Sequence, residues 1–589
     1  MFTKRVTVKR GDKTYVYLKL VESYRDGGRV RQRVIANLGR EDDLKASGQL
    51  EALAASFARL EPPMVGVRRD VGALLIVADL LERLDLQRTV DRHVPQRGTA
   101  MLSCGEVITA LIANRMCGPS PLYDVAGWAT SAAIHERLGI PGMLLNDDRL
   151  GRALEQFAPI SDTVRSELML KAIDRFGIDA GRLHLDLTCI PVSGAFEDST
   201  MIAKGWGPTG VKRQTKLLCA TNPKGVALYT RPFPGNTAEL SAIADSLEMI
   251  AANSKPGLII CADSALGHIK NLAAADQAGL RFVVPLRSST GFREKFLTEI
   301  GPDQMVPLRY VAKREANLPT GQRTQYLGAL APFDTINPET QQPFNCRVAY
   351  IWSSEEATSV ADGRERALAK AETLLTKVRN GLGGRYYKTQ KDVDNRVAVI
   401  IGHKIRPFLT VTTSTEPDTN KPTISWERNT HAITNTARTD GIYALATNIP
   451  GNITATRILK IYKDQPLVEI RHREAKGPLK VRPIFLHNDD RITAMLSIVG
   501  IALLVYGLTE TQLRTATNNQ PIPGLYPENR PALPTGRNTL TAFQGLGLTY
   551  THHGIRLDPL TTTQRTILNH LNITPPWEEQ DLPNCGKRG

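Results

Sequence analysis

The sequence predicts an α/β fold whose largest part is a mixed β-sheet. Apolar, strand-like runs occur at 183–188 and 257–263, and stretches between such runs have the apolar spacing of helices. Over residues 181–290 the predicted order is three strands, a helix, a strand, a helix and a further strand. This order is typical of a mixed sheet in which helices connect some of the strands.

Length and charge define the general class of the protein. With 589 residues the chain exceeds what one hydrophobic core normally serves, so we expect several domains. Lys and Arg number 74 against 59 Asp and Glu, and the resulting charge of +15 favours nucleic acid or an anionic membrane as partner. The longest apolar run, Met495–Leu508, is too short to span a bilayer, and no apolar signal core follows the N-terminal basic residues. We therefore expect a cytoplasmic protein with no membrane contact.

The cysteines and histidines do not predict a zinc site or a disulfide framework. No C-x-x-C pair and no H-E-x-x-H spacing occurs in the sequence. His552 and His553 are adjacent, but neighbouring residues of a strand point to opposite faces. We expect most of the seven cysteines to be small buried apolar residues.

Residues 1–70 form a predicted basic β-hairpin region. A strand over 15–20 is followed by the turn 25–28 and a return strand over 29–35. Alternation in the return strand puts Arg29, Arg31 and Arg33 on one face, where they suit contact with phosphate. A solvated basic hairpin face would have the same pattern.

Residues 71–180 form a predicted helical domain. The segments 73–81 and 105–112 have helical apolar spacing, and the Gly-Pro-Ser-Pro sequence at 118–121 breaks the pattern. Simple packing explains these helices. The function that we expect for the domain is nucleic-acid binding or dimerisation.

Residues 181–290 form the first part of the predicted sheet. A glycine-rich loop over 205–210 is followed by a basic run that contains Lys212, Arg213 and Lys216. Farther on, Asn236 and Glu239 have the spacing of a capping pair for a helix over 238–252. The order of strands and helices is that of an RNase H-like sheet.

Three acids distant in the sequence carry the candidate chemistry. Asp186 lies inside the strand-like run 183–188, and Asp263 ends the run 257–263. Glu469 belongs to a basic segment with the pattern of a helix. Two strand carboxylates and one helix carboxylate that converge on a pocket can bind two divalent ions, which activate a nucleophile and stabilise a leaving oxygen.

The rest of the chain is predicted as three segments. Residues 291–455 are a β-rich insertion that extends the sheet, with strand-like pieces at 345–351, 397–401, 408–412 and 442–447 and one amphipathic helix over 362–379. Residues 456–515 return to helix and complete the core. Residues 516–589 form a weakly structured C-terminal appendage.

The segment around Glu469 has a definite geometry if it is one helix. At 100° per residue, an arc of about 80° contains five side chains, those of Tyr462, Gln465, Glu469, Arg473 and Lys476. One carboxylate and two cations then project together, toward metal and DNA phosphate. Pro466 indicates that the helix can begin there instead, and a solvated surface helix is the alternative.

These residues resemble the DDE transposases of bacterial insertion sequences, in the subgroup with the pattern Y-x2-R-x3-E-x6-K. Tyr462, Glu469 and Lys476 occupy three of its positions, and Gln465 replaces the arginine. The segments LHLDLT around Asp186, IICADSALGHIKNL around Asp263, and PFPGNTAEL between them are similar to blocks of the family. So are residues 482–505 and the N-terminal segment that begins YLKLVESYRDGG, and all these blocks stand in the family's order.

The resemblance implies a function and a set of roles. It implies an RNase H-like core interrupted by a β-rich insertion, an N-terminal region that binds terminal inverted repeats, and a homodimer in the synaptic complex. It also implies cleavage of the element's ends and joining of the 3′ ends to target DNA with two Mg²⁺ ions, for which Mn²⁺ can substitute. Asp186 would bridge the ions and Asp263 and Glu469 would hold one each, in a protein associated with the nucleoid.

DNA contacts follow from the same model. The expected set is Tyr462, Gln465, Arg473, Lys476, Arg29, Arg31, Arg33, Lys212, Arg213 and Lys216. Trp206 and Trp426 could stack on an unpaired base, although burial in a core is the simpler expectation for both. Glu197, Asp198 and Asp440 are competing acids, and Asp440 fits a turn.

Two alternatives remain at this stage. The first is an RNase H-like DNA nuclease that cleaves without strand transfer. The second is a DNA-binding derivative whose catalysis has decayed, with Gln465 as the visible lesion.

Overall fold

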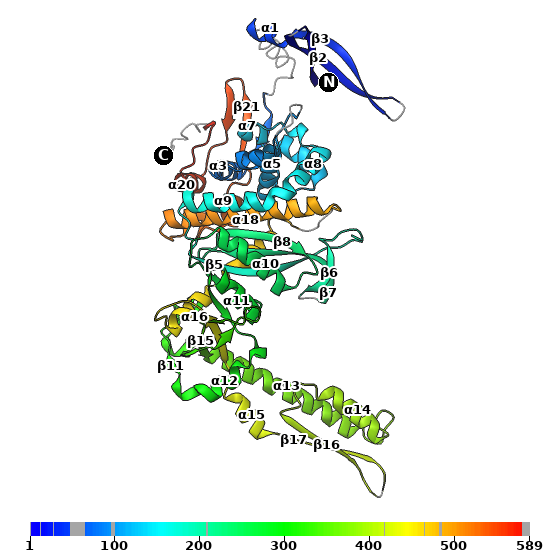
Figure 1. The fold of residues 1–589 in the computed structure, drawn as a ribbon, viewed down its shortest axis with the longest axis vertical. Helices are drawn as coiled ribbons and strands as arrows, with labels where there is room; N and C mark the ends of the chain where they lie inside the picture. The colour runs from blue at the N-terminus through cyan, green and yellow to red at the C-terminus, as the bar shows by residue number, and fades with distance from the viewer. Residues whose placement is uncertain are drawn as a thin grey trace, which may run out of the picture. The chain divides into compact units, whose positions relative to one another are not determined.

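The computed structural model describes residues 2–11, 13–26, 29–47, 65–95, 100–207, 210–417, 419–464, 466–481 and 486–579 (Figure 1). The chain divides into two compact units. The first comprises 1–69, 547–559 and 577–589, and the second comprises 70–546 and 560–576.

The first unit contains an antiparallel N-terminal sheet and strands of a second, mixed sheet. In its N-terminal sheet β1 (Phe2–Arg10) pairs with β2 (Lys13–Asp26), and β2 pairs with β3 (Arg29–Arg40), before the short helix α1 (Glu41–Ala46). The two predicted strands lie within β2 and β3. Residues 27 and 28 of the predicted turn lie outside the described residues. The second sheet has the order β23-β22-β21-β4, with bounds Glu578–Glu579, Gly554–Leu557, Gly547–Thr551 and Arg68–Asp70. In this sheet β22 and β23 are parallel.

Helices occupy residues 71–180 of the second unit, as the sequence predicts. They are α3 (Leu74–Arg83), α4 (Leu86–His93), α5 (Cys104–Cys117), α6 (Val125–Ser131), α7 (Ile134–Leu138), α8 (Asp147–Phe157) and α9 (Ser161–Phe176). A capping box between Ser103 and Glu106 starts α5, since each side chain accepts a hydrogen bond from the backbone N–H of the other residue.

The long helix α18 (Asp489–Ala516) joins these helices to the sheet. It packs against α5, α8 and α9 and also against strand β8 (Figure 1). By length and composition it could cross a membrane, but 94% of its apolar window is buried inside the protein. This burial is that of a core helix, and it explains why the run Met495–Leu508 is so apolar.

The described residues form a ten-stranded mixed sheet in the order β11-β12-β15-β18-β10-β9-β5-β7-β6, with β8 paired to β7. The strands of this sheet that come first in the chain are β5 (Arg182–Pro191), β6 (Ala203–Gly207), β7 (Gly210–Thr221), β8 (Ala227–Pro234), β9 (Ile259–Cys261) and β10 (Arg281–Pro285). Helices α10 (Glu239–Ala252) and α11 (Ile269–Gln277) connect these strands. β9 is parallel to both β5 and β10, whereas β7 is antiparallel to β5. This mixed sheet is consistent with an RNase H-like core.

Residues 306–447 continue the same sheet. The added strands are β11 (Val306–Pro307), β12 (Tyr326–Pro332), β15 (Arg347–Ser353) and β18 (Ile442–Thr447), and β18 pairs antiparallel with β10. Helix α16 (Ala455–Lys463) packs on them through Ile458 and Leu459, in a core cluster with Cys261 and Val283. The helix α17 (Pro466–Lys476) follows.

Between β15 and β18 the chain forms an additional structure, which we call the arm (residues 354–441). It contains α13 (Ser354–Asn380), α14 (Gln390–Ile400), β16 (Leu409–Thr415), β17 (Pro422–Arg428) and α15 (Thr430–Ala437). The predicted strand over 397–401 is therefore wrong, since this run lies in and just after α14. Val397 and Ile400 are apolar because they pack against the core of the arm, at helical spacing.

Two further predictions about local structure are wrong. The glycine-rich segment 205–210 is largely the β6–β7 hairpin, because Gly205 pairs with Lys212 and Trp206 with Val211. Its residues 208 and 209 lie outside the described part. The C-terminal segment is ordered up to residue 579, with β19 (Ile522–Tyr526), β20 (Arg530–Ala532), α19 (Gly536–Thr541) and α20 (Thr562–Leu571) besides the strands named above.

Candidate active site

Asp186 and Asp263 lie side by side on neighbouring strands. In the parallel pair β5–β9, His184 lies opposite Cys261, so the residues two positions farther along are Asp186 and Asp263. Both carboxyls are half-buried. Burial raises the pKa of Asp263, and the charge of Asp186 raises it further. The fold therefore brings two of the three predicted acids together.

Glu239, which the sequence analysis treats only as a capping residue, joins this pair. Its side chain is hydrogen-bonded to that of Asp263. Burial, and then the charges of Asp263 and Asp186, raise the pKa of Glu239 to about 7. The predicted capping pair does not form, because the N-cap of α10 is Ala238 and it makes no side-chain cap. The useful signal was the position of this acid, directly after a tight turn that follows strand β8.

The turn before Glu239 is fixed by backbone packing. A Cβ on Gly235 would lie 1.8 Å from the carbonyl oxygen of Gln214, so only glycine fits there. The buried Gln214 side chain donates through Nε2 to the carbonyl oxygen of Gly235 at 3.1 Å. Lys216 is also buried, and its Nζ donates to the carbonyl oxygen of Thr237 at 2.7 Å. These bonds hold the chain so that α10 begins beside Asp263.

Helix α17 is held in place by a buried ion-pair network. Arg471 is 1% exposed and donates to Glu474 at 2.5 Å and to Glu510 of α18 at 3.0 Å. Its Nε also donates to the carbonyl oxygen of Gly225 at 2.5 Å. Because a buried guanidinium is tolerated only with its charge and donors satisfied, this network sets the rotation of α17 about its axis.

That rotation turns one face of α17 toward β5. His472 Nδ1 lies 3.2 Å from Asp186 Oδ2, and Lys476 Nζ donates to Thr188 Oγ1 at 2.6 Å. Asp186 and Thr188 share a face of β5 because they are two residues apart. His472 is 7% exposed, and its Nε2 has no hydrogen-bond partner among the described residues.

Glu469 lies on α17 three residues before His472 and is exposed. No hydrogen bond or ion pair between the described residues joins it to Asp186 or Asp263. The structure thus brings together Asp186, Asp263 and Glu239, with His472 in contact, and leaves Glu469 at the neighbouring helical turn.

Of the two readings of residues 462–476, the one in which a helix begins at Pro466 is confirmed, and a single helix over the whole segment does not form. Helix α16 ends at Lys463, Asp464 forms its C-cap, and α17 begins at Pro466. Tyr462 therefore belongs to a different helix from Glu469, where it packs near Tyr443, and both burial and the charge of Asp263 raise its pKa. Gln465 lies outside the described residues. Arg473 is exposed on α17.

The other predicted DNA contacts differ in exposure. Lys212 is exposed in the β6–β7 hairpin, and Arg213 donates to the carbonyl oxygen of Phe196 at 3.1 Å. In the first unit Arg31 and Arg33 are exposed, and Arg33 forms an ion pair with Glu22 at 2.6 Å. The side chain of Arg29 lies outside the described part.

The competing acids and the two tryptophans can be placed as well. Asp440 forms an ion pair with Arg364, whereas Glu197 and Asp198 are exposed. Trp426 belongs to the core of the arm, as expected. Trp206 is 78% exposed at the β6–β7 hairpin, so the expectation of burial is wrong for this residue.

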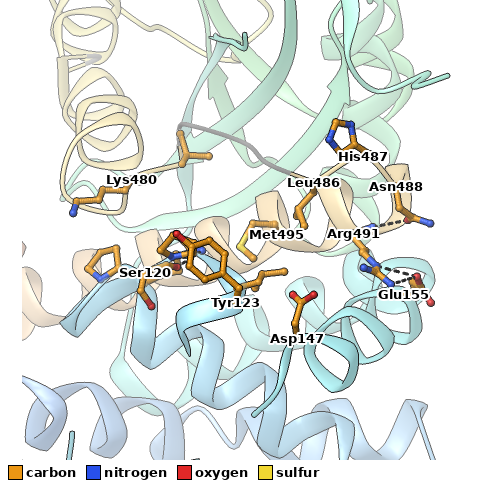
Figure 2. A pocket seen from close by; sticks show the side chains of 15 residues that line it. Ser120, Tyr123, Asp147, Glu155, Lys480, Leu486, His487, Asn488, Arg491 and Met495 are labelled. Carbon is orange, nitrogen blue, oxygen red and sulfur yellow. Dashed lines mark hydrogen bonds and ion pairs between the residues drawn. The ribbon is translucent and has the colours of Figure 1, made fainter. Parts of the chain in front are cut away.

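A cavity of about 770 Å³ lies elsewhere in the second unit (Figure 2). It is lined by helical residues such as Tyr123 and Asp147 and by Met495 of α18. Arg491 at its wall is bound to Glu155 at 2.9 Å. None of the predicted acids lines this cavity, so it is separate from the carboxylate site.

The carboxylate site fits a hard divalent cation by the chemistry of its donors. Asp186 and Asp263 provide oxygen ligands, which Mg²⁺ and Mn²⁺ prefer, and Glu239 adds a third carboxyl beside them. Burial and the neighbouring carboxylates raise the pKa values of Asp263 and Glu239, so their ionised forms are disfavoured unless a cation compensates the charge. Among the described residues no three His, Cys, Asp or Glu side chains are already arranged to hold a metal ion. A complete site therefore requires a further ligand or a local shift.

Comparisons with known proteins identify the family of the chain. Residues 179–505, more than half of the chain, match a transposase DDE domain. Residues 3–63 match the N-terminal domain of IS1634 family transposases, and residues 67–165 match a domain of unknown function, DUF4277. No curated protein matches the chain.

Proposed function

Since the chain belongs to the DDE transposases of insertion sequences, we propose that it binds the ends of its element, cleaves them, and joins the 3′ ends to target DNA. The single observation that carries the proposal is the adjacency of Asp186 and Asp263 on parallel strands, with α17 packed over them. Transposition is a phosphoryl transfer, and such a carboxylate pair suits it.

In this proposal Asp186, Asp263 and Glu469 would hold the two metal ions, and Asp186 would serve both. When bound, two Mg²⁺ ions, or Mn²⁺ in their place, activate the attacking oxygen and stabilise the leaving one. Glu469 completes the set from α17, whose next turn already contacts Asp186 through His472.

We assign Glu239 and His472 as positioning residues. Glu239 holds the Asp263 carboxyl through the hydrogen bond between them. His472 Nδ1 lies 3.2 Å from Asp186 Oδ2, and in this proposal it orients the Asp186 carboxylate. Both act through the predicted ligands and not on DNA.

The DNA contacts follow from exposure and position. In this proposal Arg473 and Lys476 of α17 contact the backbone phosphate near the cleavage point, and Tyr462 and Gln465 also contact DNA there. Lys212 and Arg213 contact the duplex from the β6–β7 hairpin. Lys216 donates a hydrogen bond to the carbonyl oxygen of Thr237, so it connects strand β7 of the hairpin to the turn before α10. Arg29, Arg31 and Arg33 bind the terminal repeat.

We also propose that the chain divides into functional segments at residues 70, 180, 290, 455 and 515. In the synaptic complex we propose that the protein is a homodimer. The Tyr-Arg-Glu-Lys subgroup remains a prediction, because Gln465 departs from its pattern.

The test uses purified protein, DNA with the element's ends, Mg²⁺ and a target plasmid. We expect end cleavage and strand transfer in the wild type. In Asp186→Ala we expect loss of both by at least about 10³-fold with end binding retained, because the substitution removes the shared ligand. Nicking without joining would support the nuclease alternative. End binding with no cleavage in Mg²⁺ or Mn²⁺ would support the decayed derivative.

A further inference from the structure

The arm has its own hydrophobic core and is therefore a defined scaffold. Leu368 and Leu375 of α13 pack with Val393 of α14, Leu409 of β16 and Ile424 of β17. Figure 1 shows these helices and strands next to one another. An element with a core of this kind can present surface side chains in fixed positions.

Two arginines of the arm form ion pairs that connect its helices to the strands and to the returning chain. Arg428 bonds to Glu372 at 2.7 Å and to Glu365 at 2.9 Å, and Arg364 pairs with Asp440 at the base. The base is closely packed, since a Cβ on Gly441 would lie 2.7 Å from the Cβ of Ala357. These contacts fix the start of α13 against the returning chain.

The outer surface of the arm carries a different set of charges. Residues 366–406 contain ten Lys and Arg residues against three acids, and all ten are exposed. No ion pair within the described residues involves any of the ten, although Arg379 lies over the ring of Trp426 at 4.9 Å and Arg385 over that of Tyr386 at 5.9 Å. They are Arg366, Lys370, Lys377, Arg379, Arg385, Lys388, Lys391, Arg396, Lys404 and Arg406.

The three acids of this segment are already engaged. Glu372 is bound by Arg428. Asp392 accepts hydrogen bonds from Thr389 at the start of α14, and Asp394 accepts from Thr413 at 2.6 Å. The excess positive charge is therefore left for a partner outside the chain.

Helix geometry separates the two sets of residues. On α13, Arg366, Lys370 and Lys377 lie within an arc of about 40°. The buried residues of the same helix, such as Leu368 and Leu375, lie on the opposite side. From Arg366 to Lys377 the cations extend along about 16 Å of helix, a length that can follow several phosphates.

We propose that the arm binds the target DNA duplex through its phosphates, without regard to base sequence. A dense array of unpaired Lys and Arg is complementary to a polyanion and neutralises phosphates with release of counterions. The element's ends must be recognised by sequence, which requires contacts with base edges. Target DNA requires only backbone contacts, and the arm offers these. This inference rests on the proposed function, since a target is defined by strand transfer.

The test compares two variants of the full-length protein at the same four exposed positions. One carries Lys370→Gln, Lys377→Gln, Lys388→Gln and Lys391→Gln, and the matched control carries arginine at each position. The first readout is binding to a random-sequence duplex over a range of salt concentrations. The second is end cleavage against strand transfer into a plasmid.

In the glutamine variant we expect random-duplex binding and strand transfer to fall by about tenfold or more. The magnitude of the slope of log K against log salt should decrease by about 3.6 if all four lysines contact phosphate, because each lost phosphate contact contributes about 0.9. End binding and end cleavage should stay within about twofold, and the arginine variant should resemble the wild type.

Unchanged random-duplex binding in the glutamine variant would overturn the proposal. An equal fall in end cleavage and strand transfer would also overturn it, because the arm would then bind the element itself. Should the wild type neither cleave nor join DNA, the proposed function fails, and the arm's duplex binding is still measured by the first readout.

Discussion

Helix α17 and the arm are both rich in basic residues, but they use positive charge in opposite ways. In α17 the central cation, Arg471, is 1% exposed and fully engaged by Glu474 and Glu510. In the arm, cations such as Lys370 and Lys377 are exposed and unpaired within the described residues. Charge in the first region positions a helix, and charge in the second is free for a partner.

The difference teaches how basic segments should be interpreted. A basic run in a sequence can be a DNA surface or a buried network, and only the burial of each side chain separates the two. For α17 the sequence suggested outward cations beside Glu469. Arg473 is exposed as expected, but Lys476 is bonded to Thr188, and the fold buries Arg471, His472 and Glu474 of the same helix.

The largest expected effect tests the structural role of charge in α17. Arg471→Ala should lower the free energy of unfolding by about 3–5 kcal/mol, because it leaves two buried carboxylates without their partner. Arg396→Ala in the arm should change it by about 0.5 kcal/mol or less. Chemical denaturation of both variants measures the contrast. Equal losses would refute the distinction between the two regions.

A smaller effect is expected at the contact between α17 and the carboxylates. His472→Ala should reduce end cleavage by about 10–100-fold, because Asp186 loses the group that orients it. Affinity for Mn²⁺ should fall in parallel, whereas end binding should persist. His472→Asn, which can donate a hydrogen bond, should recover part of the activity. If His472→Ala lowers only thermal stability and leaves Mn²⁺ affinity unchanged, the residue is structural.

The smallest effect concerns pH. The pKa of Glu239 is raised to about 7, so ionisation of this group opposes folding. Its contribution to stability is present at acidic pH and is lost as the pH rises from the ordinary glutamate range through about 7. Added Mg²⁺ should therefore raise the melting temperature more at pH 8 than at pH 5.5.

Glu239→Gln is the matched variant for this measurement, because it keeps the shape of the side chain and removes its titration. In Glu239→Gln, the rise in melting temperature caused by Mg²⁺ should depend less on pH than in the wild type. An identical pH dependence in both proteins would show that Glu239 is not part of the charge cluster.

The central sheet and two acids could be predicted because their signals are local. Asp186 lies in an apolar strand-like run, and Asp263 ends another. The strands β5 and β9 pair in parallel, and this pairing brings the two acids close together. Glu239 was missed because an acid near a helix start has an ordinary explanation as a cap. His472 was missed because its role depends on the rotation of α17, which is set by residues as distant as Glu510 and Gly225.

The arm illustrates a second limit. Residues 397–401 are apolar and β-branched, so the sequence favours a strand, but packing on α13 makes most of this run helical. Trp206 illustrates the reverse case, since a large aromatic residue remains exposed because the hairpin that carries it has no neighbour over that side chain among the described residues. Tertiary contacts decided both outcomes.

The most direct test of the carboxylate site is crystallography of the protein with its end DNA and Mn²⁺, with the ions located by anomalous scattering. We predict manganese peaks within about 2–2.6 Å of carboxylate oxygens of Asp186, Asp263 and Glu469. Peaks bound only by other residues, or a Glu469 carboxylate that stays outside the coordination sphere, would contradict this account.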